Sequence, residues 1–207
     1  MQNSNKLLST QNIIKMAFLS AIAAILMQWG IKLPAIFPSF LEIDFSEVPA
    51  LVAILTINPW AGIVVVVIKN LLKGLLFGSS TGYVGELANM LISIGYVLPL
   101  TLVVRKSKEM RHITKGIIGG IFGIMITGAI VNYFITIPLY AQVFMPMETI
   151  IEIGHAIIPA VTDKFTLVML SITPFNLVKG TLVAVASVAF IKALQPALKY
   201  LMPKKAA

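Results

Sequence analysis

The sequence lacks cysteine, has few charged residues and carries none of the common catalytic motifs. Without cysteine there is no disulfide framework and no thiol chemistry. Charged residues make up 12% of the 207 residues, against about a quarter in a soluble domain, whereas 58% are hydrophobic. The apolar runs are too long and too many for one soluble core, so the composition predicts a membrane protein.

Motifs for nucleotide binding and hydrolysis are missing as well. The sequence has no G-x-x-x-x-G-K-[ST] loop, dinucleotide fingerprint, H-E-x-x-H motif or G-x-S-x-G elbow. Glu152 and His155 have helical metal-ligand spacing, but a lone pair in a loop is rarely a metal site. We therefore predict a chain that is not an enzyme, has no ATP site of its own, and holds neither a metal nor a cofactor.

Six apolar segments are present, and roughly 20 apolar residues cross a bilayer core of about 30 Å. They predict an all-α polytopic membrane protein with six transmembrane helices in a single domain, residues 1–207. Asn58-Pro59 separates the second segment from the third, because proline cannot continue a helix. The second segment is too short for an upright span. The segments are 13–31, 45–57, 60–77, 83–104, 116–140 and 167–194.

The charges indicate an orientation. Six spans place both termini on one side, and only Glu109 among the acidic residues lies there. The positive-inside rule therefore places both termini in the cytoplasm, and the net charge of +8 reflects orientation rather than nucleic-acid binding. The same side holds 11 of the 16 basic residues: Lys6, Lys15, Arg105, Lys106, Lys108, Arg111, Lys115, Lys192, Lys199, Lys204 and Lys205.

Two long connections face the outside, residues 33–44 and 142–166. Both contain large apolar side chains, and exposed apolar surface is unfavourable unless it packs on something. Two interpretations stay open: loops that lie on lipid or on their own helices, and a lid over an outward-facing pocket.

Polar residues at membrane depth are costly, and each is a candidate site. Asn132 falls in the outer half of the fifth span. Thr173-Pro174 predicts the start of the sixth helix, which places Asn176 and Lys179 on one face in its first turns. There the ammonium opposes the helix dipole, so it needs an oxygen partner or a ligand. The three side chains either bind a polar heterocycle together or satisfy one another.

Other polar and small residues give weaker signals. We predict that Lys69, Asn70 and Lys73 extend to the membrane interface. Glu86 and Asn89 either line the same pocket or pair with those lysines.

Small residues at spacing four favour close helix packing. In the first span, Ala17 and Ala21 form one such stripe and Ser20 and Ala24 another, and these predict a partner surface. Four glycines between residues 116 and 123 predict internal packing in the fifth span.

Four stretches, taken together and in order, resemble the riboflavin-specific S components of energy-coupling factor (ECF) transporters. They are residues 41–49 (LEIDFSEVP), 78–89 (GSSTGYVGELAN), 131–134 (VNYF) and 172–180 (ITPFNLVKG). The likeness covers nearly the whole chain, and the number of spans agrees.

The resemblance implies a multi-pass protein of the bacterial cytoplasmic membrane that binds riboflavin with high affinity at its outer side. Its partners are a transmembrane coupling protein (T component) and two cytoplasmic ATPases, and the loop before Asp44 acts as a gate. The first-helix residues Ala17, Ala21 and Ala24 contact the coupling protein. The substrate-binding residues are Asn132, Asn176, Lys179, Leu41, Asp44, Tyr83 and Glu86.

Some alternatives stay open at this point. One is an S component for another vitamin, such as folate or thiamine, and another is an ion-coupled carrier, whose buried charges look similar. Binding of flavin mononucleotide in addition to riboflavin is also open.

Overall fold

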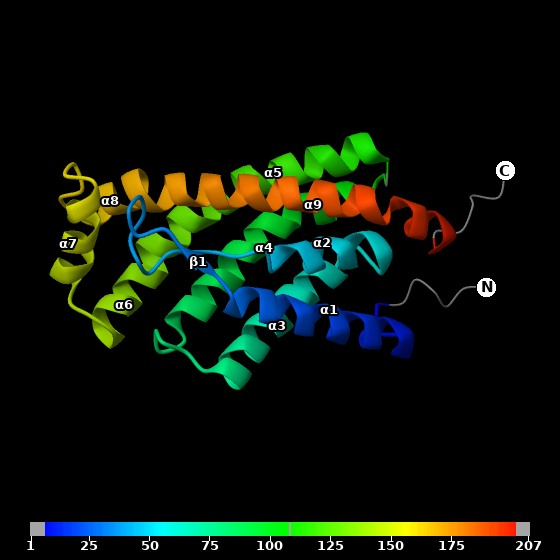
Figure 1. Cartoon of the computed structure of the whole chain (residues 1–207), viewed down its shortest axis with the longest axis horizontal. Helices are drawn as coiled ribbons and strands as arrows, with labels where there is room; N and C mark the ends of the chain where they lie inside the picture. Colours follow the sequence, from blue (N-terminus) through cyan, green and yellow to red (C-terminus); the bar gives the residue numbers. More distant parts are fainter. Residues whose placement is uncertain (1–6, 108, 202–207) are drawn as a thin grey trace.

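Helices make up most of the molecule, as the computed structural model in Figure 1 shows. The structure describes residues 7–107 and 109–201, with side chains as far as residue 193; Lys6, Lys108, Lys204 and Lys205 lie outside the described residues, and the Lys199 side chain outside the described side chains. The helices are α1 (Thr10–Gln28), α2 (Glu47–Thr56), α3 (Ala61–Phe77), α4 (Val84–Val104), α5 (Met110–Val131), α6 (Ile137–Val143), α7 (Met147–Ile157), α8 (Lys164–Leu167) and α9 (Thr173–Leu201).

A small hairpin corrects the all-α prediction. Strands β1 (Ile31–Lys32) and β2 (Glu42–Ile43) pair antiparallel, with Ile31 opposite Ile43. Lys32 and Glu42 face each other across the pair and form an ion pair of 3.2 Å. The hairpin fixes both ends of the 33–41 loop, so the chain returns to the bundle directly before α2.

Four helical stretches of the described chain are long and apolar enough to cross a membrane: Thr10–Gln28, Val84–Val104, Met110–Val143 and Lys164–Ala193. The remaining predicted spans coincide with shorter helices, since α3 has 17 residues and α2 has 10. At 1.5 Å per residue, α2 is roughly 15 Å long, about half of a bilayer core. The helical class is thus observed, whereas the count of six spans stays a prediction.

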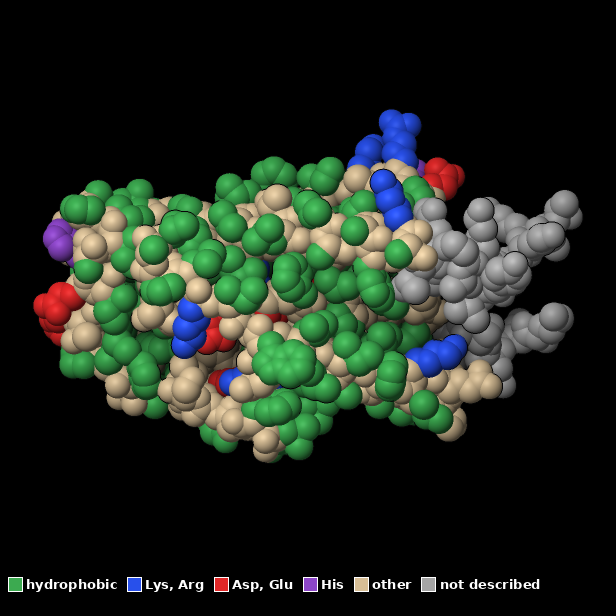
Figure 2. All heavy atoms as spheres, viewed as in Figure 1, with side chains coloured by type: hydrophobic (Ala, Val, Ile, Leu, Met, Phe, Trp, Pro, Cys, Tyr) green, Lys and Arg blue, Asp and Glu red, His purple; other side chains and the backbone are tan. Residues whose placement is uncertain are grey.

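Apolar side chains cover much of the outside of the bundle (Figure 2). Phe18, Leu75 and Phe122 are each more than 60% exposed. Side chains of this kind are stable against lipid. In Figure 2, basic side chains gather at the end where α4 connects to α5, and acidic and histidine side chains lie at the opposite end, near α7.

Helices α4 and α5 pack most closely where glycines lie between them. A Cβ added at Gly123 would overlap the carbonyl oxygen of Gly95, and one at Gly120 would lie 2.6 Å from the carbonyl oxygen of Tyr96. Glycine is the residue that permits such close backbone approach. The prediction of internal packing for the glycines of the fifth span is confirmed.

Two π-helical turns interrupt long helices next to prolines. Turn η1 (Asn132–Thr136) joins α5 to α6, and η2 (Val168–Ile172) joins α8 to α9. Pro138 and Pro174 follow these turns by two residues. Proline lacks an N–H and crowds the carbonyl four residues before it, and the wider turn accommodates both effects. Each helix therefore continues through its proline.

The predicted start of the sixth helix at Thr173-Pro174 is wrong for this reason. The helix begins at Lys164, after Asp163, whose carboxylate accepts a hydrogen bond of 2.8 Å from the backbone N–H of Thr166. That bond lowers the pKa of Asp163. The outer connection 142–166, predicted to be a loop, also contains helix α7.

Candidate ligand-binding pocket

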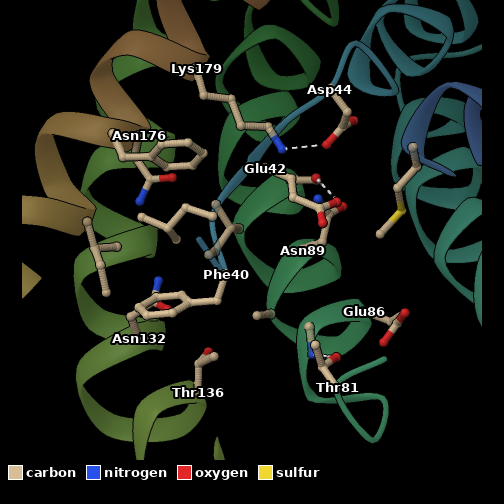
Figure 3. A pocket seen from close by; sticks show the side chains of 18 of the residues that line it. Phe40, Glu42, Asp44, Thr81, Glu86, Asn89, Asn132, Thr136, Asn176 and Lys179 are labelled. Carbon is tan, nitrogen blue, oxygen red and sulfur yellow. Dashed lines mark hydrogen bonds and ion pairs between the residues drawn. The ribbon is translucent and has the colours of Figure 1, made fainter. Parts of the chain in front are cut away.

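A polar cavity opens between the segment that enters α2, the start of α4, turn η1 and helix α9 (Figure 3). Its volume is about 150 Å³. Pockets for drug-sized ligands usually measure about 300–1,000 Å³, so side chains or the hairpin loop must move apart to admit a ligand of that size. Six of the seven predicted ligand-binding residues line the cavity: Leu41, Asp44, Glu86, Asn132, Asn176 and Lys179.

The two asparagines reach the cavity from neighbouring helices on the same side of it (Figure 3). Asn132, in η1, is 6% exposed, and its amide donates a 2.7 Å hydrogen bond to the carbonyl of Gly128. Asn176, in α9, is 3% exposed, and its amide nitrogen is buried without a partner. A Cβ at Gly128 would overlap that amide, so the glycine makes room for it. The Asn176 amide nitrogen therefore lies against Gly128, and its amide oxygen is the atom turned toward the cavity (Figure 3).

Lys179 lies on the same face of α9 as Asn176 and is 5% exposed. Its ammonium donates to Asp44 Oδ2 at 2.7 Å, and Glu47 Oε1 lies 4.0 Å away. Because the helix begins at Lys164, Lys179 stands 15 residues inside it, roughly 22 Å from its start. The predicted conflict with the helix dipole is therefore absent, and carboxylates offset the cost of burying the ammonium.

The carboxylate of Asp44 is held by its own loop as well as by Lys179. Its Oδ1 accepts from the backbone N–H of Ser46 at 2.9 Å and also from the Ser46 hydroxyl. Asp44 thus sits at a tight turn directly before α2, and it links the hairpin segment to α9 across the cavity (Figure 3).

A second buried lysine lies behind this pair. Lys69, in α3, is fully buried and donates to Glu47 Oε1 at 3.1 Å and to the hydroxyl of Ser46. Ser93, in α4, donates to the same Glu47 oxygen at 2.6 Å. The prediction that Lys69 extends to the membrane interface is wrong, because its partner carboxylate lies inside the bundle on α2.

Its neighbours on α3 also have partners within the protein. Asn70 is 4% exposed and donates to the carbonyl of Val66 at 2.8 Å. Lys73 forms an ion pair with Glu86 of α4, whose second oxygen accepts a 2.7 Å hydrogen bond from Ser79. Glu86 therefore does both things that the sequence left open: it lines the cavity and pairs with a lysine.

Tyr83 departs from the prediction. It does not line the cavity, and its side chain is 59% exposed. Its backbone is left-handed, with φ at 66°, at the start of α4. In this conformation the ring lies against α3, where a Cβ at Gly74 would come within 3.2 Å of it. The tyrosine covers the outside of the α3–α4 contact.

The small-residue stripes of α1 divide between two faces. Ala17 and Ala21 are exposed. Ala24 is 1% exposed, and Ser20, whose hydroxyl donates to the Met16 carbonyl at 2.7 Å, is fully buried. The prediction of a partner surface at Ala24 is therefore corrected, since its methyl group belongs to the internal packing of the bundle.

Sequence reasoning missed several residues that line the cavity. Phe40 and Phe175 provide its aromatic surface, and Thr136 and Glu47 add polar groups. Glu47 could have been predicted as a pocket residue, because it is an acidic residue at the start of an apolar segment. Phe40 and Phe175 could not have been predicted, because aromatic residues are common in apolar runs.

The pocket can bind and orient a small polar molecule, with amide, ammonium and carboxylate groups facing aromatic surface. No group of three or more metal-ligating side chains occurs in the described part of the chain. A helical bundle with an apolar exterior and a buried polar pocket defines a membrane-embedded binding protein.

The comparisons with known proteins identify the family. The model of the ECF transporter, substrate-specific component, matches residues 11–191, and the chain belongs to this family. The family is a transport component rather than an enzyme.

Curated relatives and a solved structure agree with this assignment. The chain is 33% identical to the riboflavin transporter FmnP of Bacillus subtilis (strain 168), over 89% of this chain and 93% of that protein. It is 32% identical to the riboflavin transporter RibU of Staphylococcus aureus (strain TCH60), over 96% and 99%. A solved S component of a bacterial ECF transporter superposes with a TM-score of 0.73 at 28% identity, covering 91% of this chain and 98% of that one.

Proposed function

We propose that this chain is the riboflavin-binding subunit of an ECF-type vitamin importer. The observation that carries the proposal is the convergence of Asn132, Asn176 and Lys179, all nearly fully buried, on one cavity. Family membership and the two riboflavin transporters at 33% and 32% identity support the choice of riboflavin.

The chemistry of the pocket suits a flavin. The isoalloxazine ring has carbonyl and ring-nitrogen acceptors, which match the remaining donors of Lys179, and a ring N–H, which matches the amide oxygen of Asn176. Phe40 and Phe175 supply flat apolar surface for the ring system. Leu41 is the last residue of the hairpin loop and Asp44 directly follows β2, so movement of this loop would open the pocket.

The proposed topology has six spans, both termini in the cytoplasm and the pocket toward the outside. The positive-inside rule supports it, because the basic connection between α4 and α5 and the acidic helix α7 lie at opposite ends of the molecule. The exposed stripe of Ala17 and Ala21 is the proposed contact with the transmembrane coupling protein. Two cytoplasmic ATPases then supply the energy.

A flavin titration of the purified protein tests the ligand. We expect saturable quenching of riboflavin fluorescence with one site per chain, and no comparable response to thiamine or folate. Saturable binding of thiamine or folate without riboflavin binding would assign another vitamin.

Reconstitution tests the transport role. Liposomes that contain this chain alone should bind riboflavin without accumulating it, and uptake should require the coupling protein and ATPases. Accumulation driven by an ion gradient in the chain alone would instead establish a secondary carrier.

A further inference from the structure

One carboxylate oxygen at the pocket has no partner. Glu47 is 1% exposed and lines the cavity. Its Oε1 accepts from Lys69 at 3.1 Å and from Ser93 at 2.6 Å, whereas its Oε2 is buried without a hydrogen-bond partner. A buried oxygen that lacks a donor is costly, and a carboxylate oxygen more so than a neutral one.

The surrounding structure engages the other oxygen of this carboxylate. Glu47 stands in the first turn of α2, where the helix dipole stabilises a negative charge. Lys69 on α3 and Ser93 on α4 donate to Oε1 from two other helices. Oε2 is therefore the acceptor of this cavity-lining carboxylate that the protein itself leaves without a donor.

The charges around Glu47 are balanced without a ligand, and the other lining carboxylates, Glu42 and Glu86, form ion pairs with Lys32 and Lys73. Asp44 and Glu47 provide two negative charges, and Lys179 and Lys69 provide two positive charges within 4.0 Å of them. A ligand thus needs no charge of its own to satisfy Glu47. It needs a neutral N–H or O–H group.

We infer that Glu47 binds the transported ligand directly, through Oε2, as the acceptor of a hydrogen bond from an N–H or O–H donor. Lys69 and Ser93 act as positioning residues for it. The inference rests on the proposed function for the identity of the ligand. Riboflavin offers two kinds of donor, the ring N3–H and the ribityl hydroxyls. Glu47 then selects ligands that carry a donor at this point and disfavours those with an acceptor there.

The test combines variants of Glu47 with flavins that lack one donor. In Glu47→Gln, Lys69 and Ser93 hold the amide oxygen in the Oε1 position, so the amide nitrogen replaces Oε2 and presents a donor to the ligand. Glu47→Gln/Lys69→Met removes the carboxylate with balanced charge, and Ser93 alone then holds the amide. Thr101→Val is the matched control, because Thr101 is fully buried but bonds to the Pro59 carbonyl instead.

We expect both Glu47 variants to weaken riboflavin binding about 10-fold or more, as for a lost hydrogen bond to a charged group. Thr101→Val should leave the affinity unchanged. Two analogues each lack one kind of donor: 3-methylriboflavin lacks the N3–H, and lumiflavin lacks the ribityl hydroxyls. One of the two should bind to the wild type and to the Glu47 variants with equal affinity. The analogue with equal affinities identifies the donor that meets Glu47.

Three results would overturn the inference. They are unchanged riboflavin affinity in the Glu47 variants, an equal loss for all three flavins, and a wild type that binds all three flavins alike. Melting of the ligand-free proteins shows whether each variant is folded, and if neither Glu47 variant folds, the wild-type comparison of the three flavins decides. A wild type that binds no flavin refutes the proposed function itself, and so is distinct from failure of this inference.

Discussion

At the scale of single residues, the pocket contains an ion pair that joins two distant segments of the fold and that we propose also contacts the ligand. Lys179 has three N–H donors, and Asp44 takes one of them at 2.7 Å. The pair holds the segment before α2 against α9, and the other donors remain for the ligand. Removal of either partner therefore has two effects, one on stability and one on binding.

Lys179→Met should lower both stability and affinity. Loss of one partner of a buried ion pair costs about 3–5 kcal/mol, because the other charge stays buried without compensation. Asp44→Asn/Lys179→Met removes both charges and should regain most of the lost melting temperature without regaining riboflavin affinity. Thermal melting in detergent and a flavin titration separate the two effects. A double variant no more stable than Lys179→Met would show that the ion pair adds nothing to the fold.

The sequence predicted the residues of the pocket unevenly, and the reason is physical. Asn132, Asn176 and Lys179 were predictable because a polar group at membrane depth is costly wherever its partners are. The partner of Lys69 was not predictable, since Glu47 lies 22 residues away on another helix. The prediction that Lys69 extends to the membrane interface used only its position along its own helix. Its contacts with other helices hold it inside the bundle instead.

At the scale of elements, helix α1 has one exposed face and one buried face. Ala21 is exposed and Ala24 is 1% exposed, three residues apart on the same helix. Ala21→Glu should therefore leave flavin binding intact and block uptake when the coupling module is present. Ala24→Glu should destabilise the protein, because it buries an unpaired charge.

Binding, melting and uptake assays on the two alanine variants distinguish the faces. Loss of flavin binding in Ala21→Glu would place that residue in the internal packing. Normal melting in Ala24→Glu would contradict its buried position.

The α4–α5 contact gives a second prediction for elements. Gly123→Ala should destabilise the fold by about 1–3 kcal/mol, because the new methyl group meets the backbone of Gly95 and neither helix can yield easily. Gly119→Ala, one turn away, meets only the ring of Pro99 at 3.1 Å and should have a smaller effect. Thermal melting measures the difference, and equal melting temperatures for the two variants would contradict it.

Hydropathy predicted the places of the main helices, but it did not predict how two of them pass proline. Pro174 had the pattern of a first helical residue, preceded by threonine as a cap. The η2 turn shows instead that the helix widens and continues. A local rule for helix starts cannot anticipate this, because the wider turn is stabilised by packing against other helices.

At the scale of the whole molecule, the absence of cysteine makes the orientation easy to test. Thr149→Cys in α7 and Lys106→Cys after α4 introduce single exposed thiols. We expect an impermeant maleimide to label Thr149→Cys in intact cells and Lys106→Cys only after permeabilisation. The reverse pattern would invert the proposed topology.

Asp44, Glu47, Lys69 and Lys179 together carry no net charge, and this affects the energy of transport across a membrane potential. Moving one elementary charge through a potential of 100 mV involves about 2.3 kcal/mol. These two ammonium and two carboxylate groups cancel, and the lining carboxylates Glu42 and Glu86 are paired with Lys32 and Lys73. A pocket of this kind, loaded with an uncharged vitamin, carries no net charge through that field. Import should therefore proceed at the same rate whether valinomycin and potassium gradients polarise the vesicle or not, leaving ATP hydrolysis as its driving force.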